Sequence, residues 1–335
     1  MNHHPARQIA AVALPADHAD WLAIDVGAEI DRIAEALRVQ VLRQLNRRGI
    51  VLGLSGGIDS SVCAALAIRA IGPERVLAVL MPERDSDPES LRLGQLVAET
   101  FGIDTVTEDI APMLQALGCY RRRDDFIRTI VPEFGEGWGC KVALSGGAYN
   151  ITRLVVESPA GARRTLRMPL DVYLGVVAAT NMKQRTRKQL EYYHADRLNY
   201  AVLGTPNRLE YDQGFFVKNG DGAADVKPIA HLYKTQVYAL AEELGVPDEI
   251  RARPPTTDTW SLPQSQEEFY FSVPYPAMDL CLHGLNNGLP RERVALATGL
   301  RPEEVDSVWQ DIAAKRRATR YLHEPPLLLE PVLAP

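Results

Sequence analysis

The sequence predicts an α/β fold, a doubly wound parallel sheet with helices on both faces and an inserted β-hairpin. Short apolar runs of strand length alternate with segments of helical periodicity, and this alternation is typical of a parallel sheet. Small polar loops follow the runs that end at Leu54 and Leu203. Because ligands of such sheets bind beyond the carboxyl ends of the strands, we expect both loops to open on the same side.

The individual elements follow from the spacing of apolar residues. Apolar side chains recur at helical spacing over residues 25–46, and Gly49 ends this helix. Its apolar stripe either packs wholly inside the molecule or leaves a part for a second copy of the chain. We expect strands at 50–54, 75–80, 105–107 and 200–203, further helices at 59–70, 89–100 and 172–197, and an irregular segment before the last of these helices.

The loop from Ser55 to Ser61 reads Ser-Gly-Gly-Ile-Asp-Ser-Ser and joins a strand to the start of a helix. Unpaired backbone N–H groups and the helix dipole favour an anion there, and adjacent glycines allow close approach of phosphates. We expect Ser55, Ser60 and Ser61 to add hydroxyl donors. Asp59 would repel a polyphosphate unless a cation lies between them, which suggests Mg²⁺. A Walker loop would end in Gly-Lys-Ser/Thr, and this loop lacks that lysine.

Composition excludes several classes of protein. The 335 residues carry a net charge of −6 and are 46% hydrophobic, so we expect neither a nucleic-acid partner nor disorder. No apolar run reaches the ~20 residues that span a membrane, and the N-terminus lacks a signal pattern. The cysteines are too far apart for a Cys-x-x-Cys site, which indicates a reducing, cytoplasmic location.

Several motifs, in order, resemble one enzyme family. The loop at Ser55 resembles the pyrophosphate-binding loop of the N-type ATP pyrophosphatases, which share an adenine nucleotide alpha hydrolase-like fold. Residues 204–210 read Gly-Thr-Pro-Asn-Arg-Leu-Glu, and residues 215–225 contain Phe-Val-Lys-Asn-Gly-Asp-Gly-Ala-Ala-Asp. Together with 181–187, 232–237 and 255–258, these motifs resemble NAD synthetase of the ammonia-dependent type.

The resemblance implies an activity and an organisation of the chain. NAD synthetase activates nicotinic acid adenine dinucleotide with ATP as an acyl-adenylate, releases pyrophosphate, and lets ammonia displace AMP to form NAD. It implies an N-terminal extension at 1–24, one synthetase domain at 25–330, an insertion at about 119–170, and a homodimer. About 24 residues precede the first expected helix, too few for a glutamine-hydrolysing domain of well over a hundred residues. We therefore expect free ammonia to be the nitrogen source.

The resemblance also assigns site residues. It makes Asp59, Glu210 and Lys234 catalytic, and it lets Asp59 and Glu210 hold Mg²⁺. The ATP-binding residues that it implies are Gly53, Leu54, Ser55, Gly56, Gly57, Ile58, Asp59, Ser60, Thr205, Lys234 and Thr256. The residues that it places at the dinucleotide are Arg185, Lys218, Asp221, Asp225 and Lys315.

Two segments depart from the family pattern. In our alignment Tyr270 stands where the family has a glutamate that faces the dinucleotide. The aromatic residues at 269–271 either fill the core or an interface, or one of them stacks on a base or pyridine ring. Residues 315–317 match a family His-Lys-Arg only in part, since no histidine precedes them.

The insertion contains alternating segments at 141–144 and 151–156, and a turn at 158–161 leads to 165–168. This pattern predicts a β-hairpin. Its polar residues on both faces are compatible with a solvated decoration, a lid or an oligomer contact.

Other functions stay open from the sequence alone. The same loop could adenylate and amidate a different acid, such as nicotinate mononucleotide. Alternatively, the chain could be a degenerate nucleotide-binding module without turnover. The presence of Asp59, Glu210, Lys218 and Lys234 together argues against the second alternative.

Overall fold

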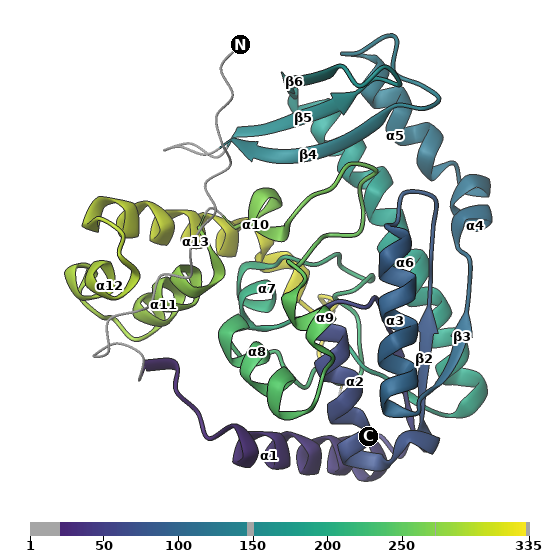
Figure 1. The fold of residues 1–335 in the computed structure, drawn as a ribbon, viewed down its shortest axis with the longest axis vertical. Coiled ribbons are helices and arrows are strands. Elements are labelled where there is room, and N and C mark those ends of the chain that lie inside the picture. Colours follow the sequence, from purple (N-terminus) through teal and green to yellow (C-terminus); the bar gives the residue numbers. More distant parts are fainter. Residues whose placement is uncertain (1–20, 146–150, 272, 333–335) are drawn as a thin grey trace.

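The computed structural model describes residues 21–145, 151–271 and 273–332. Its centre is a parallel sheet of strand order β3-β2-β1-β7 (Figure 1). Every neighbouring pair in this sheet is parallel, and Leu203 extends the last strand through a bridge to Val226. The predicted doubly wound α/β fold is confirmed. The strands are β1 (Ile50–Gly53), β2 (Val76–Leu80), β3 (Asp104–Thr107) and β7 (Ala201–Val202).

Helices cover both faces of this sheet, and the strand residues alternate between them. Ile50 and Leu52 point to the face covered by α1, α2, α3 and α8, whereas Val51 points to the face covered by α6. Because both faces are covered, β1 and β2 are apolar without interruption. The helices are α1 (Val26–Val39), α2 (Ile58–Ile71), α3 (Pro88–Phe101), α6 (Leu170–Leu198) and α8 (Lys234–Glu243).

The apolar stripe of the first helix packs inside the molecule from Ile30 to Val41, whereas Leu45 at its end is 38% exposed. Ile30, Ile33 and Leu37 are at most 5% exposed and belong to the same core as α2 and α8. The helix continues as a π-helical turn, Gln40–Gln44, whose Val41 is also buried. The burial from Ile30 to Val41 favours the internal alternative for this stripe.

The connection between β3 and α6 is more ordered than the sequence predicts. The segment expected to be irregular contains the helices α4 (Ala111–Ala116) and α5 (Cys119–Arg128). The expected hairpin is confirmed as β5 and β6, which the turn at 158–161 joins, and β4 pairs with β5 to complete a three-stranded antiparallel sheet, here called the inserted sheet. Its strands are Gly139–Ser145, Ile151–Glu157 and Arg163–Arg167, at the top of Figure 1.

One face of the inserted sheet is buried. The side chains of Cys140, Val142, Leu154 and Val156 pack against α6 and Trp260. Register explains this burial, since Cys140 lies opposite Val156 and Val142 opposite Leu154, and opposite residues share a face. The expectation that both faces could be solvated is therefore wrong, because the polar residues occupy mainly the other face.

The C-terminal third adds helices at one end of the molecule. A separate apolar core joins α11, α12 and α13 through residues such as Met278, Val294 and Val305. None of the helices in the described part of the chain is long and apolar enough to cross a membrane. The remaining elements are η3 (Pro73–Arg75), α7 (Arg208–Gln213), α9 (Asp248–Ala252), α10 (Gln266–Phe269), α11 (Tyr275–Asn286), α12 (Arg291–Thr298) and α13 (Pro302–His323).

Candidate active site

The loop after β1 has the backbone of an anion-binding site. Helix α2 begins at Ile58 after Gly57, whose extended backbone caps it without a side-chain acceptor. The amides of the first turn are therefore left for a ligand. Gly56 has φ of 71°, and a Cβ there would lie 2.7 Å from both Cβ of Leu93 and the carbonyl oxygen of Ser90. Only glycine lets α3 pack this closely against the loop.

The hydroxyl groups of the loop are partly used within it. Ser60 and Ser61 donate to the carbonyl of Gly57 at 3.0 and 2.8 Å, and the hydroxyls of Ser55 and Ser60 are 3.2 Å apart. Ser61 is fully buried and does not line the cavity described below. The expectation that Ser61 offers a hydroxyl to a ligand is therefore wrong, whereas Ser55 and Ser60 do line that cavity.

Asn207 joins the two carboxylates that the sequence singles out. Its side-chain N–H donates to Oδ1 of Asp59 at 3.1 Å, and its side-chain oxygen caps α7. The backbone N–H of Asn207 donates to Oε2 of Glu210 at 3.0 Å, and the two residues together form a capping box. Lys234 forms an ion pair with Oδ2 of Asp59, and Gln266 donates to Oε1 of Glu210 at 3.2 Å.

The electrostatics of this group indicate a place for a cation. Burial, followed by the nearby charge of Asp59, raises the pKa of Glu210 to about 8. Burial disfavours the charged form of Lys234, but the carboxylates of Asp59 and Glu210 outweigh it and raise its pKa. Only one lysine compensates the two carboxylates. An added cation would stabilise the ionised form of Glu210 and lower its pKa.

The carboxylates of Asp59 and Glu210 are suitable ligands for a magnesium ion. No group of three or more His, Cys, Asp or Glu side chains with metal-binding geometry occurs among the residues that the structure describes. Asp59 and Glu210 could supply two carboxylate ligands to such an ion, and phosphate and water oxygens would supply its other ligands. This is the manner in which Mg²⁺ is usually bound beside nucleotides.

The loop and the carboxylates open into a cavity of about 1090 Å³. The backbone and side chains of fifteen of the predicted site residues line it. These are Gly53, Leu54, Ser55, Gly56, Gly57, Ile58, Asp59, Ser60, Arg185, Thr205, Glu210, Lys218, Asp221, Thr256 and Lys315.

Two predicted residues lie outside the cavity lining. Lys234 is fully buried behind Asp59, so its charge acts through that carboxylate. Asp225 accepts a hydrogen bond from the backbone N–H of Val202 at 2.8 Å and one from the hydroxyl of Tyr192 at 3.2 Å. Within one chain, Asp225 thus fastens the end of β7.

The predicted substrate cations are positioned by backbone carbonyls. Lys218 donates to the carbonyls of Tyr321 and Glu324 at 2.6 and 2.8 Å, at the end of α13. Arg185 donates to the carbonyl of Lys218 at 3.2 Å. Lys315 donates to the carbonyl of Tyr270 at 2.6 Å and also pairs with the carboxylate of Asp311 at 2.6 Å. These bonds join α6, α13 and the loop at Lys218 on one side of the cavity.

Tyr270 belongs to an aromatic cluster. Its ring stacks on Phe215 at 4.4 Å between centroids, and its hydroxyl donates to the carbonyl of Gln213 at 2.7 Å. The ammonium of Lys315 lies 4.4 Å from the ring centroid. Tyr270 thus packs within the protein and also lines the cavity, as Phe269 does, so both alternatives for the aromatic residues stay open.

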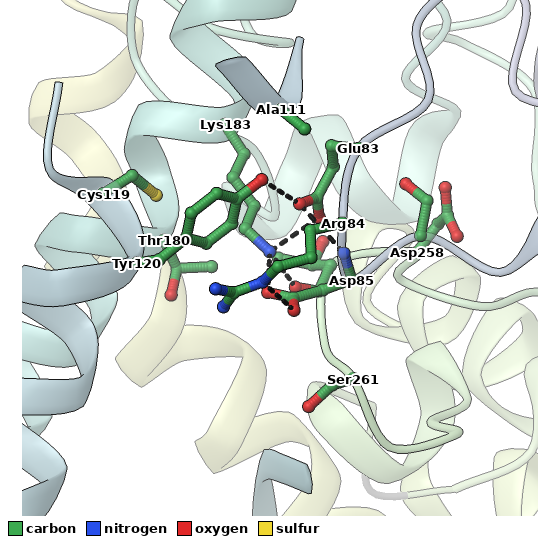
Figure 2. Close-up of polar contacts among 12 residues, drawn as sticks. Glu83, Arg84, Asp85, Ala111, Cys119, Tyr120, Thr180, Lys183, Asp258 and Ser261 are labelled. Carbon is green, nitrogen blue, oxygen red and sulfur yellow. Dashed lines mark hydrogen bonds and ion pairs between the residues drawn. The ribbon is translucent and has the colours of Figure 1, made fainter. Parts of the chain in front are cut away.

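Sequence reasoning missed a buried cluster of charges beside the cavity (Figure 2). Lys183 on α6 is 1% exposed and donates to Glu83 at 2.7 Å, to Asp85 at 2.8 Å and to the carbonyl of Thr259 at 2.8 Å. Tyr120 donates to Glu83 at 2.8 Å. We call Lys183, Glu83, Asp85, Tyr120 and Arg123 the Lys183 cluster.

Each carboxylate of the Lys183 cluster has a basic partner within the cluster. Burial opposes ionisation of Asp85, but Lys183 and Arg123 outweigh it and lower its pKa to about 2. Arg123 pairs with Asp85 at 2.6 Å and is itself 4% exposed. Burial and the neighbouring Glu83 raise the pKa of the Tyr120 phenol. The cluster thereby ties the loop after β2 to α5, to α6 and to the segment at Thr259.

Comparisons with known proteins agree with this geometry. A family model described as NAD synthase matches residues 29–133 and 166–321. The chain belongs to the NAD synthase family. An NH(3)-dependent NAD(+) synthetase from Rhizobium meliloti (strain 1021) is 69% identical over 318 residues, covering 94% of this chain and 95% of that protein. A protein of the same name from Thermotoga maritima is 35% identical over 241 residues, covering 72% and 81%.

Solved structures support the NAD synthase fold. NMN synthetase from Francisella tularensis superposes with a TM-score of 0.64 at 22% identity, covering 91% of this chain and 99% of that one. An NH3-dependent NAD synthetase from Campylobacter jejuni superposes with a TM-score of 0.60 at 22% identity, covering 92% and 100%. At these identities the comparison concerns the fold.

Proposed function

We propose that the protein uses ATP to convert the nicotinate carboxylate of nicotinic acid adenine dinucleotide into the amide of NAD⁺, with ammonia as nitrogen source. The observation that carries the proposal is the joint placement of the anion-binding loop, Asp59 and Glu210 at one cavity. Its volume lies at the upper end of ligand pockets, which reach about 1,000 Å³, so it has room for more than one nucleotide. Relatives 60–69% identical carry the name NH(3)-dependent NAD(+) synthetase.

The chemistry explains why such a site is needed. A carboxylate is a poor electrophile, so its oxygen first attacks the α-phosphorus of ATP, which forms an acyl-adenylate and releases pyrophosphate. Ammonia then attacks the acyl carbon, and AMP leaves. The amides at the start of α2 are held in place before the reaction and face the developing phosphate charge. Mg²⁺ bound by Asp59 and Glu210 would neutralise phosphate charge.

The products of ATP test the proposal. With nicotinic acid adenine dinucleotide, Mg²⁺ and ammonium, we expect AMP, pyrophosphate and NAD⁺ in equal amounts, measured by chromatography. Ammonium-free glutamine in place of ammonium should give no NAD⁺. Formation of ADP and orthophosphate as first products would contradict the reaction, and glutamate formed in step with NAD⁺ would contradict ammonia as the nitrogen source.

We also propose that the protein works as a homodimer. The family resemblance supports this state, since such enzymes build the dinucleotide site from two subunits. In addition, Leu170 and Leu174 at the start of α6 are 71% and 56% exposed, and Leu174 borders the cavity. Light scattering at assay concentration should give twice the chain mass. A fully active monomer would contradict the proposal.

A cytoplasmic location fits the cysteines. Cys63, Cys119, Cys140 and Cys281 are all free thiols and all buried. A reducing compartment keeps such thiols unpaired. We therefore propose that NAD⁺ is formed in the cytoplasm.

A further inference from the structure

Part of the cavity wall comes from the segment that the family model leaves unmatched. Val142 on β4 and Thr152 on β5 line the cavity, and both lie between residues 133 and 166. Val142 shares the buried face of the inserted sheet with Leu154. Thr152 precedes Leu154 by two residues, so its side chain lies on the same face. Farther along the strand, this face borders the cavity.

Helix α6 extends from the start of the phosphate loop to this wall. Glu191 lies beside Gly53, where an added Cβ would be 2.8 Å from its Oε1. Tyr173 and Leu174, near the other end of the helix, line the cavity together with Val142. Seventeen residues separate Leu174 from Glu191, which at 1.5 Å per residue is about 25 Å. The inserted sheet therefore bounds the end of the cavity that is far from the phosphate loop.

The inserted sheet is fixed to the segment that carries Thr256 and Gln266. The hydroxyl of Ser261 accepts from the backbone N–H of Cys140 at 2.9 Å, and the N–H of Leu262 donates to the carbonyl of Cys140 at 3.3 Å. The side chain of Gln264 donates to the carbonyl of Val142. Residues 261–264 thus run along β4 and are held by it.

The Lys183 cluster holds the same segment from another side. Lys183 donates to the carbonyl of Thr259, two residues before Ser261, and Figure 2 shows Lys183 and Ser261 near this loop. The wall is therefore supported both by α6 and by the inserted sheet. A wall held at several points cannot retreat freely from a bulky ligand.

The chemistry of the far end differs from that of the loop end. Val142, Thr152, Tyr173 and Leu174 themselves offer apolar and hydroxyl surface without charge, while the cavity lining also includes the ion pair of Lys315 and Asp311. The charged groups at Asp59 and Glu210 belong to the loop end. A polyphosphate therefore suits the loop end, and the organic part of a second nucleotide suits the far end.

We propose that Val142 and Thr152 of the inserted sheet form the far wall of the subsite for the carboxylate-bearing nucleotide and determine its fit. This inference rests on the proposed function. Substitution of Thr152 by a larger residue shortens the far end while leaving the ATP loop intact. The side chain contacts the substrate's distal portion, so it acts on substrate affinity and not on adenylation itself.

The test compares two tryptophan variants of the same sheet. Thr152→Trp should raise KM for nicotinic acid adenine dinucleotide at least tenfold and leave KM for ATP within twofold. Thr165→Trp, on an exposed position of β6 away from the cavity, should change neither. Thr152→Glu, a smaller side chain than tryptophan, should also raise the dinucleotide KM, because it places a charge against the organic part of the substrate. Circular dichroism establishes that each variant is folded.

The outcomes separate this inference from the proposed function. No NAD⁺ from the unmodified enzyme would contradict the function. If the enzyme is active, and folded Thr152→Trp and Thr152→Glu keep the original dinucleotide KM, the proposal that Thr152 forms the far wall of the subsite is contradicted. An equal rise in KM for ATP and for the dinucleotide would also contradict it, because the substitution would then act on the whole cavity.

Discussion

Replacing Asp59 by asparagine should lower the rate of NAD⁺ formation by about a hundredfold or more, the usual order for loss of one group that stabilises transferring charge. Asparagine keeps the shape of the side chain and removes its charge. In the structure that charge faces Lys234 and lies across Asn207 from Glu210. Glu210→Gln should have an effect of the same order, since the two carboxylates act on one cation.

The measurement is pyrophosphate release in single-turnover conditions, with thermal unfolding as a check on the fold. Asp248→Asn serves as the matched control, because its carboxylate is 92% exposed and lies on α9 outside the site. The control should keep the original rate. If Asp59→Asn and Glu210→Gln both turn over at near-normal rates while folded, neither residue belongs to the reaction centre.

The parallel sheet and the phosphate loop could be predicted because their signals are local. Ile50 to Leu54 form an uninterrupted apolar run, and the residue types of the following loop suit a helix N-terminus. Glu210 is located by the resemblance of residues 204–210 to the family motif, and in the structure the spacing from Asn207 to Glu210 is that of a capping box. The same spacing could have identified Asn207 itself, which the sequence analysis left out of the site.

The burial of the inserted sheet and the Lys183 cluster could not be predicted because they depend on contacts between residues far apart in the sequence. From the sequence, Val142 and Leu154 read as members of an exposed hairpin, whereas in the structure α6 and Trp260 cover them. Lys183 meets Glu83 across 100 positions and Asp85 across 98. A lysine in a helix is typical of a solvated face, and no local pattern indicates that it is buried.

The positions of Lys218 and Lys315 show another limit of prediction from sequence. The motifs indicate that these cations lie at the site, and both line the cavity. Sequence does not indicate that backbone carbonyls hold them, as the end of α13 does for Lys218. Such bonds depend on where a distant helix ends.

Lys183→Met should cause the largest loss of stability among single substitutions at the site. It leaves the buried carboxylates of Glu83 and Asp85 without their shared cation, and breaking a buried ion pair on one side costs about 3–5 kcal/mol. The thermal midpoint should fall by several degrees. Replacing Lys183 and Glu83 together, as Lys183→Met with Glu83→Gln, should recover part of this loss, because Asp85 keeps Arg123 as its partner and no buried carboxylate is then left without a cation.

The pH dependence of this loss identifies its origin. The pKa of Asp85 is lowered from 3.8 to about 2, so ionised Asp85 stabilises the fold fully above pH 4, and that stabilisation is lost as the pH falls through 2. Without Lys183, the pKa of Asp85 should rise. The difference in thermal midpoint between the original protein and Lys183→Met should therefore be greatest near neutral pH and shrink toward pH 2. Arg291→Met, which breaks an exposed pair with Asp306, is the control and should shift the midpoint little at any pH. A difference that stays constant with pH would show that Lys183 stabilises the fold by packing and not by its charge.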